Sequence, residues 1–303
     1  MKNRLLFVLL ILAHVVSGQT EKPVQVPGTK CSLIPPRGFI AATTFSGFQN
    51  AETGASIMIN ELPAPYQSLV DGFTADALKT RGMTLVSKEN IYFHGSKATL
   101  INVTQPANGT LYIKQMLIFS KSNVTIIVNG IYPEASKEVG GKIKDAILST
   151  VYNASLNDNS LEAAPFTIET SGTEFKLIKY ISGSLLFSTD GKIPTEKPTL
   201  LVGNSVAKVT TQNKKTYAEE RLKKLPRGGQ NIITEVNEIT IDDLNGYEIV
   251  ADGKTKDDKP ELVYQVMLFV DSGDYYMIIR HAKEDFNKYL EIFKKISKTF
   301  KRK

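Results

Sequence analysis

The chain has 303 residues, of which 42% are hydrophobic and 22% are charged, and its formal net charge is +6 at pH 7. This composition is that of an ordinary globular protein, so it excludes an intrinsically disordered chain and a membrane protein with several spans. The length fits two domains of roughly 130 to 150 residues, inside the usual range of about 50–250 residues per domain.

The amino terminus has the pattern of a secretory signal peptide. Lys2 and Arg4 supply positive charge, residues 5–13 form an apolar run, and small residues precede Gln19. The run is shorter than the roughly 20 residues of a membrane span, which disfavours a signal anchor. We therefore expect residues 1–18 to be cleaved and the mature chain to be secreted or periplasmic. Without Lys2 and Arg4 the formal charge falls from +6 to +4.

Residues 19–153 are predicted to form a first domain. Pro35 and Pro36 end a strand that begins at Cys31, because proline cannot continue a central strand. Apolar residues at spacings of three and four then predict one helix over residues 66–80. Further strands are expected at 39–45, 55–60, 83–93, 97–103, 111–119 and 124–130, followed by a closing helix with Ala135, Val139, Ile143, Ala146, Ile147 and Val151 on its buried face.

Residues 154–165 have little apolar content and are predicted to be a linker. Residues 166–303 then form a second domain, which begins with irregular strands over 166–187. Strands are expected at 200–209, 231–241, 246–252, 262–270 and 275–281, with a helix over 214–225 and Gly246 matching Gly95 of the first domain. The last helix should bury Phe286, Tyr289, Leu290, Phe293, Ile296 and Phe300.

Two apolar hairpins suggest that the second domain repeats the first. Each joins two runs of β-branched and aromatic residues through a short polar turn, at residues 120–123 and 271–274. The blocks that begin at Gln115 and Gln265 lie 150 residues apart. A helix, an antiparallel meander and a closing helix, in that order and repeated, predict an α+β fold in which helices cover each sheet.

This order of elements resembles the PsbP-like superfamily. The segment Ile34-Pro35-Pro36-Arg37-Gly38-Phe39 is similar to the family's opening turn, and residues 55–59 are similar to its second strand. Residues 175–192 depart from the pattern because they lack the turn. The resemblance implies tandem α/β/α sandwiches and a role in binding or assembly, since the known members are mostly not enzymes. It transfers no catalytic residue to this chain.

The supply of catalytic side chains is thin. Outside the signal segment the chain has two histidines, His94 and His281, and one cysteine, Cys31. We expect the histidines at the surface and Cys31 as a small apolar residue of a strand. Three such ligands are too few for a structural zinc site, and neither a phosphate-binding glycine loop nor a nucleophile elbow is present. A pocket that held either histidine against a carboxylate would count against a non-catalytic protein.

Other candidate sites are weaker. No cofactor and no nucleic acid are expected, although Tyr275-Tyr276 beside Arg280 mixes aromatic and basic residues. Asn102, Asn108, Asn123 and Asn153 begin sequons that matter only in a glycosylating organism. Acidic residues between the later strands are candidates for calcium, but the lysines among them favour a solvated loop; they are Asp242, Asp243, Asp252, Asp257 and Asp258.

The leading hypothesis is an exported, non-catalytic binding or assembly protein with two PsbP-like domains. Its partner would be an unknown protein or a small ligand, bound between or beside the sheets. One alternative is an exported hydrolase that uses Asp/Glu chemistry. Another is a structural protein of the envelope that contacts anionic surfaces through the basic residues of the last helix and tail; these are Lys294, Lys295, Lys298, Lys301, Arg302 and Lys303.

Overall fold

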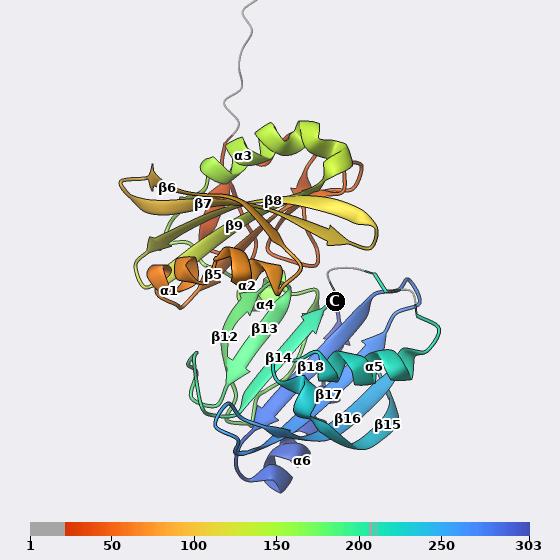
Figure 1. The fold of residues 1–303 in the computed structure, drawn as a ribbon. Helices are drawn as coiled ribbons and strands as arrows, with labels where there is room; N and C mark the ends of the chain where they lie inside the picture. Colours follow the sequence, from red (N-terminus) through yellow and green to blue (C-terminus); the bar gives the residue numbers. More distant parts are fainter. Residues whose placement is uncertain (1–21, 206–207, 210) are drawn as a thin grey trace, which may run out of the picture.

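The computed structural model describes residues 22–205, 208–209 and 211–303, so the predicted signal peptide lies outside the described residues. The fold is mixed α/β and contains two seven-stranded antiparallel sheets, one in each half of the chain (Figure 1). Among the described residues, no helix combines the length and the apolar character needed to cross a membrane.

The first sheet has the strand order β3-β4-β5-β9-β8-β7-β6. One face is covered by α1 (Tyr66–Asp71) and α2 (Ala75–Lys79), and the other by the 3-10 turn η1 (Glu134–Val139) and α3 (Gly140–Leu148). A separate small sheet joins β1 (Val24–Gln25), β2 (Cys31–Leu33) and β10 (Val151–Tyr152). The strands of the main sheet are β3 (Ile40–Ala41), β4 (Gly47–Asn50), β5 (Ala55–Leu62), β6 (Thr84–Phe93), β7 (Ser96–Ala107), β8 (Thr110–Lys121) and β9 (Val124–Pro133).

The second sheet has the strand order β12-β13-β14-β18-β17-β16-β15, which repeats the first order strand for strand. Its faces are covered by α5 (Lys214–Lys223) and α6 (Phe286–Ser297). The strands are β12 (Lys176–Ile181), β13 (Ser184–Ser188), β14 (Thr199–Asn204), β15 (Ile232–Ile241), β16 (Leu244–Lys254), β17 (Pro260–Phe269) and β18 (Tyr275–Ala282); the small elements are α4 (Ser160–Ala163), β11 (Phe166–Thr167), η2 (Gly228–Gln230) and β19 (Lys301–Arg302), which pairs with β11.

Each sheet has an apolar core on both faces. In β8, Leu117 and Phe119 pack toward α3, whereas Met116 and Ile118 pack toward α1 and α2. Neighbouring side chains of a strand point to opposite faces, so a strand covered on both sides must be apolar at nearly every position. This explains why the two predicted hairpins, now β8–β9 and β17–β18, are rich in apolar residues.

Some predicted elements were wrong in detail. The helix predicted over residues 66–80 is broken into α1 and α2, because Gly72 ends the first helix and the Thr74 side chain caps the second. The closing helix of the first half begins as a 3-10 turn, which leaves Ala135 exposed, and Val151 belongs to β10. The bounds of the linker stay a prediction; residues 154–165 contain α4, and Ala164 just after it is buried in the core of the second half.

The predicted match between the two halves was also wrong by a few positions. The ladders place the turn His94-Gly95 opposite Asp242-Asp243, since the pairs Phe93/Ser96 and Ile241/Leu244 flank the two turns. Gly246 therefore does not correspond to Gly95.

The same ladders show that Gln115 corresponds to Tyr264 and not to Gln265. Gln115 donates to Tyr132 Oη on the α3 side at 3.3 Å, whereas Gln265 donates to the carbonyl of Ala218 in α5 at 2.8 Å. A shift of one residue moves a strand side chain to the other face, so the 150-residue spacing matched residues of opposite faces.

Candidate functional site

The two halves meet through the ends of β5 and β14, which take the same place in their sheets. At the end of β5, Asn60 Oδ1 accepts from the Ser182 amide at 3.1 Å and from Ser182 Oγ at 2.8 Å, in the β12–β13 turn. At the end of β14, Asn204 Nδ2 donates to the carbonyl of Thr44 at 3.2 Å, in the β3–β4 loop. The junction is thus reciprocal, since each strand end contacts the equivalent loop of the other half.

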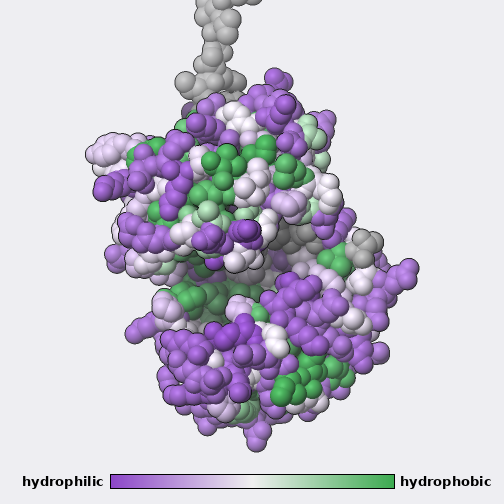
Figure 2. Space-filling model, viewed as in Figure 1, coloured by the Kyte–Doolittle hydropathy of each residue, from purple (hydrophilic) through white to green (hydrophobic). Residues whose placement is uncertain are grey.

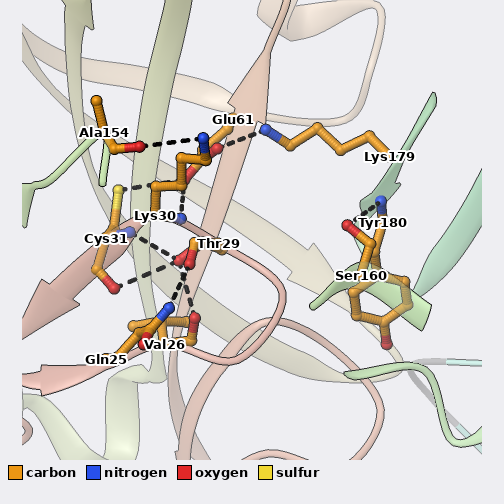
Figure 3. Close-up of polar contacts among 10 residues, drawn as sticks. All are labelled: Gln25, Val26, Thr29, Lys30, Cys31, Glu61, Ala154, Ser160, Lys179 and Tyr180. Atoms are coloured by element: carbon orange, nitrogen blue, oxygen red, sulfur yellow. Dashed lines mark hydrogen bonds and ion pairs between the residues drawn. The ribbon is translucent and has the colours of Figure 1, made fainter. Parts of the chain in front are cut away.

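A buried ion pair closes the β5 side of this junction (Figure 3). Glu61 is 2% exposed, and its Oε2 lies 2.5 Å from Nζ of Lys179 on β12. Its Oε1 accepts from the Lys30 amide at 2.5 Å and lies 3.6 Å from Cys31 Sγ. Burial, followed by the nearby Glu61 carboxylate, raises the pKa of the Cys31 thiol. Cys31 is fully buried, as expected for a small apolar residue, and it stays a protonated thiol.

The β14 side of the junction opens into a cavity of about 840 Å³, and Figure 2 shows a recess between the two halves. The cavity lies on the α5 face of the second sheet, with Leu201 and Met277 in its floor. The first half contributes Asn108, in the tight turn between β7 and β8. Residues far apart in the sequence therefore surround one space large enough for a small molecule.

The charged groups around this junction cavity are cationic. Arg221 on α5 and Lys208 line it, and no Asp or Glu is among the lining residues that the structure describes. Arg221 Nε and Asn204 Oδ1 are buried, and within the described part of the chain neither atom has a hydrogen-bond partner. A buried donor without a partner is costly, so the Arg221 donor is free for a ligand.

Two tyrosines form an aromatic wall of the junction cavity. The rings of Tyr217 and Tyr275 lie 5.8 Å apart in an edge-on arrangement. Burial, together with hydrogen bonding to Tyr275, raises the pKa of Tyr217 to about 12, so its phenol stays neutral at physiological pH. Neutral phenols beside a guanidinium suit an anionic head attached to an apolar or aromatic body. Sequence reasoning missed this site; the only available signal was Tyr217 and Arg221 on one face of a helix, four residues apart.

His94 and Asp242 each bind the segment that follows a closing helix. His94 Nε2 donates to the carbonyl of Thr150 at 3.0 Å, just after α3. Asp242 Oδ2 accepts from the Arg302 amide at 3.0 Å and from Arg302 Nε at 2.7 Å, just after α6. The Arg302 side chain also lowers the pKa of Asp242. The two equivalent turns therefore hold the segments that follow the two closing helices.

The candidate metal ligands are not brought together. Asp242 and Asp243 form the turn before β16, whereas Asp257 and Asp258 lie in the turn after it, at the opposite end of the strand, with Asp252 near that end. Within the described ranges no group of three or more His, Cys, Asp or Glu side chains is close enough to hold a metal ion.

The basic tail is bound to the protein surface. Arg302 pairs with Asp242, and Lys303 Nζ donates to the carbonyls of Leu161 and Glu162 at 2.6 and 3.0 Å. The last strand, β19, pairs with β11. Two of the six basic groups counted for an anionic surface are therefore engaged within the chain.

His281 lies in a second, smaller pocket of about 270 Å³. Its Nδ1 is 3.4 Å from Oε2 of Glu261, which is 10% exposed. Thr199 is its direct partner on the neighbouring strand β14. The observation that would count against a non-catalytic protein, a pocket with a histidine against a carboxylate, is thus present in part.

Comparisons with known proteins assign no family. No protein-family model matches the chain, and no curated protein is similar to it. Solved structures give distant matches. The cyanobacterial PsbP of Synechocystis is 12% identical over 47% of this chain and 99% of its own, with a TM-score of 0.33. LpqN of Mycobacterium tuberculosis, described as involved in cell envelope biogenesis, is 13% identical over 43% and 88%, with a TM-score of 0.33.

A third match spans both halves. The type VI secretion immunity protein TplEi of Pseudomonas aeruginosa is 9% identical over 92% of this chain and 97% of its own, with a TM-score of 0.32. TM-scores this far below 0.5 establish neither a shared fold nor a shared function.

Proposed function

We propose that this protein is a non-catalytic binding protein whose ligand is a small amphipathic anion held in the junction cavity. The observation that carries the proposal is the buried Arg221 Nε, which has no partner among the described residues and lies in a cavity lined by cations but by no described acid. A carboxylate or phosphate group would accept from Arg221 in a charge-assisted hydrogen bond. The apolar part would lie over Leu201 and Met277, beside Tyr217.

We further propose that the chain is exported and consists of two PsbP-like domains, residues 19–153 and 166–303, joined by residues 154–165 after a signal peptide of residues 1–18. The shared strand order of the two sheets supports a duplication. The reciprocal contacts of Asn60 and Asn204 support two similar units that bind each other through equivalent surfaces. A ligand in the junction cavity would then contact both units.

The test is a fluorescence titration with 8-anilinonaphthalene-1-sulfonate, an aromatic anion that serves as a probe. We expect Arg221→Gln to weaken probe binding about tenfold or more, because a hydrogen bond to a charged group is lost. Arg81→Gln removes the same charge from an exposed site in the first half and serves as the matched control. Equal affinities for the wild type and Arg221→Gln would refute the proposal.

The second candidate function is a hydrolase centred on His281. It is favoured by the His281–Glu261 pair and by Thr199, whose hydroxyl stands on the adjacent strand. A histidine oriented by a carboxylate can act as a general base for a neighbouring hydroxyl. Hydrolysis of p-nitrophenyl esters that is lost in both His281→Asn and Thr199→Val would establish this activity, and absence of turnover in the wild type would remove it for these substrates.

A further inference from the structure

The pocket around His281 gathers charged side chains from five segments of the chain. His281 and Lys283 come from the end of β18, and Glu261 comes from the start of β17. Arg227 lies between α5 and η2, and Lys256 lies in the turn between β16 and β17. Lys197 and Glu196 belong to the connection between β13 and β14. Four lysine or arginine side chains and two carboxylates line the pocket, and a third carboxylate, Glu284, pairs with Lys197 at 3.4 Å, so positive charge stays in slight excess.

The carboxylate in the floor of this pocket is already compensated. Glu261 is nearly buried, and burial alone raises its pKa. The neighbouring His281, Lys283 and Arg227 outweigh burial, so the net pKa of Glu261 is lowered and it stays ionised. Glu261 thus neutralises part of the cluster. Lys283 is paired with Glu196, Lys197 is paired with Glu284, and Arg227 Nε donates to the carbonyl of Lys254 at 3.3 Å. This leaves Lys256 and the terminal nitrogens of Arg227 for an added anion.

The other carboxylate, Glu196, lies on the solvent side of the cationic cluster. Its side chain is 71% exposed, yet it forms an ion pair with Lys283. Hydrogen bonding to Lys283 and the charges of Lys283, Lys256 and Lys259 lower the pKa of Glu196. A solvent-exposed carboxylate that pairs with Lys283, in a pocket also lined by Lys256, marks where an external anion would be held.

We propose that this pocket is a binding site for a phosphate or sulfate group, which displaces Glu196 from Lys283. Such a group carries more charge and more acceptor oxygens than one carboxylate, so it can bind Lys283 and Lys256 together. Arg227 offers a planar set of donors at the pocket wall. The site is separate from the junction cavity, because the two sets of lining residues do not overlap.

The experiment is calorimetric titration of the whole protein with inorganic phosphate and with sulfate at low salt, with chloride at equal ionic strength as the reference. We expect saturable binding of the two divalent anions but not of chloride. Lys283→Gln should weaken binding about tenfold, because a charged hydrogen-bond donor is lost. Glu196→Gln should tighten it about two- to fivefold, because the competing carboxylate is removed.

Matched variants separate this site from general charge effects. Lys298→Gln and Glu291→Gln change the same charges at exposed positions of the last helix region and should leave the affinity unchanged. Arg221→Gln should also bind phosphate like the wild type. If Lys283→Gln and Glu196→Gln both bind like the wild type, or if no saturable binding occurs, the inference is wrong. If only Arg221→Gln loses phosphate binding, the anion belongs to the junction cavity; the inference is then wrong while the proposed function stands.

Discussion

The two sides of the junction start from the same topology and end differently. Glu61 on β5 and Asn204 on β14 are equivalent, since each is the partner of the equivalent residue on the next strand, Ile126 or Tyr276. On one side the Glu61 carboxylate binds Lys179 and closes the contact. On the other side the neutral Asn204 borders the junction cavity. At this one equivalent position, a buried ion pair holds the halves together on one side of the junction, and a neutral hydrogen bond beside the cavity does so on the other.

The cores beneath the two closing helices also differ at an equivalent position. At one position of β9, Gly130 lets α3 pack directly on the strand, and a Cβ atom there would lie 2.2 Å from Ile143 Cγ2. The equivalent residue of β18 is Arg280, fully buried between Tyr264 and Phe293. Within the described chain its guanidinium nitrogens have no hydrogen-bond partner. Burial lowers the pKa of Arg280 to about 9, so the group is still charged at neutral pH.

The same strand order accommodates large differences at equivalent points. An ion pair, an amide, a glycine and a buried cation all occur at matched positions of one topology. The order of strands follows from the apolar pattern of each half, whereas individual polar residues decide how the halves join and what they bind.

The largest effect is expected at the junction. Glu61→Ala leaves Lys179 nearly buried without its partner and removes the acceptor of the Lys30 amide, so the free energy of unfolding should fall by about 3–5 kcal/mol. The equivalent change, Asn204→Ala, removes neutral hydrogen bonds to the carbonyls of Thr44 and Ser205 and should cost about 1–2 kcal/mol. Urea denaturation measures both. Similar losses of unfolding free energy for the two variants would contradict the contrast between the ion-paired side and the neutral side of the junction.

A smaller effect of opposite sign is expected in the core. Arg280→Met replaces a buried guanidinium that has no hydrogen-bond partner among the described residues with an apolar side chain of similar length, and it should stabilise the protein by about 1–4 kcal/mol at neutral pH. Tyr264→Phe serves as the comparison, because it deprives the buried Glu248 carboxylate of its donor at 2.7 Å and should destabilise by about 1–3 kcal/mol. Thermal unfolding distinguishes the two variants. A destabilised Arg280→Met would show that the contacts of the guanidinium in the folded protein outweigh the cost of its burial.

The smallest effect is expected at the contacts that His94 and Asp242 make with the segments after the closing helices. Arg302 lowers the pKa of Asp242, so this contribution to stability is present above the ordinary Asp pKa of about 3.9 and is lost as the pH falls through the lower folded pKa. Asp242→Asn should remove this acid-dependent part and speed hydrogen exchange of the Arg302 amide. His94→Ala, at the equivalent turn, should leave the loss of stability below pH 4 unchanged. If the stability of Asp242→Asn and of the wild type falls equally at acid pH, the Asp242–Arg302 contact does not stabilise the fold.

Sequence patterns predicted the elements that depend on neighbouring residues. The hairpins β8–β9 and β17–β18 and the amphipathic α6 were predicted, because alternation and helical spacing are local properties. The break between α1 and α2 was missed because one apolar stripe runs through both helices. The register between the halves was misjudged because identical letters at Gln115 and Gln265 carry no information about which face they occupy.

By itself, the sequence determined that two similar halves of antiparallel strands and helices follow each other, because each half encodes its own apolar pattern. Only the tertiary structure decided that Glu61 meets Lys179, that Arg221 lines the same cavity as Asn108, and that Glu196, Lys256 and Lys283 converge on one pocket. These contacts join residues that are far apart in the chain. Their proximity depends on strand register and on how the halves pack, which local spacing does not encode.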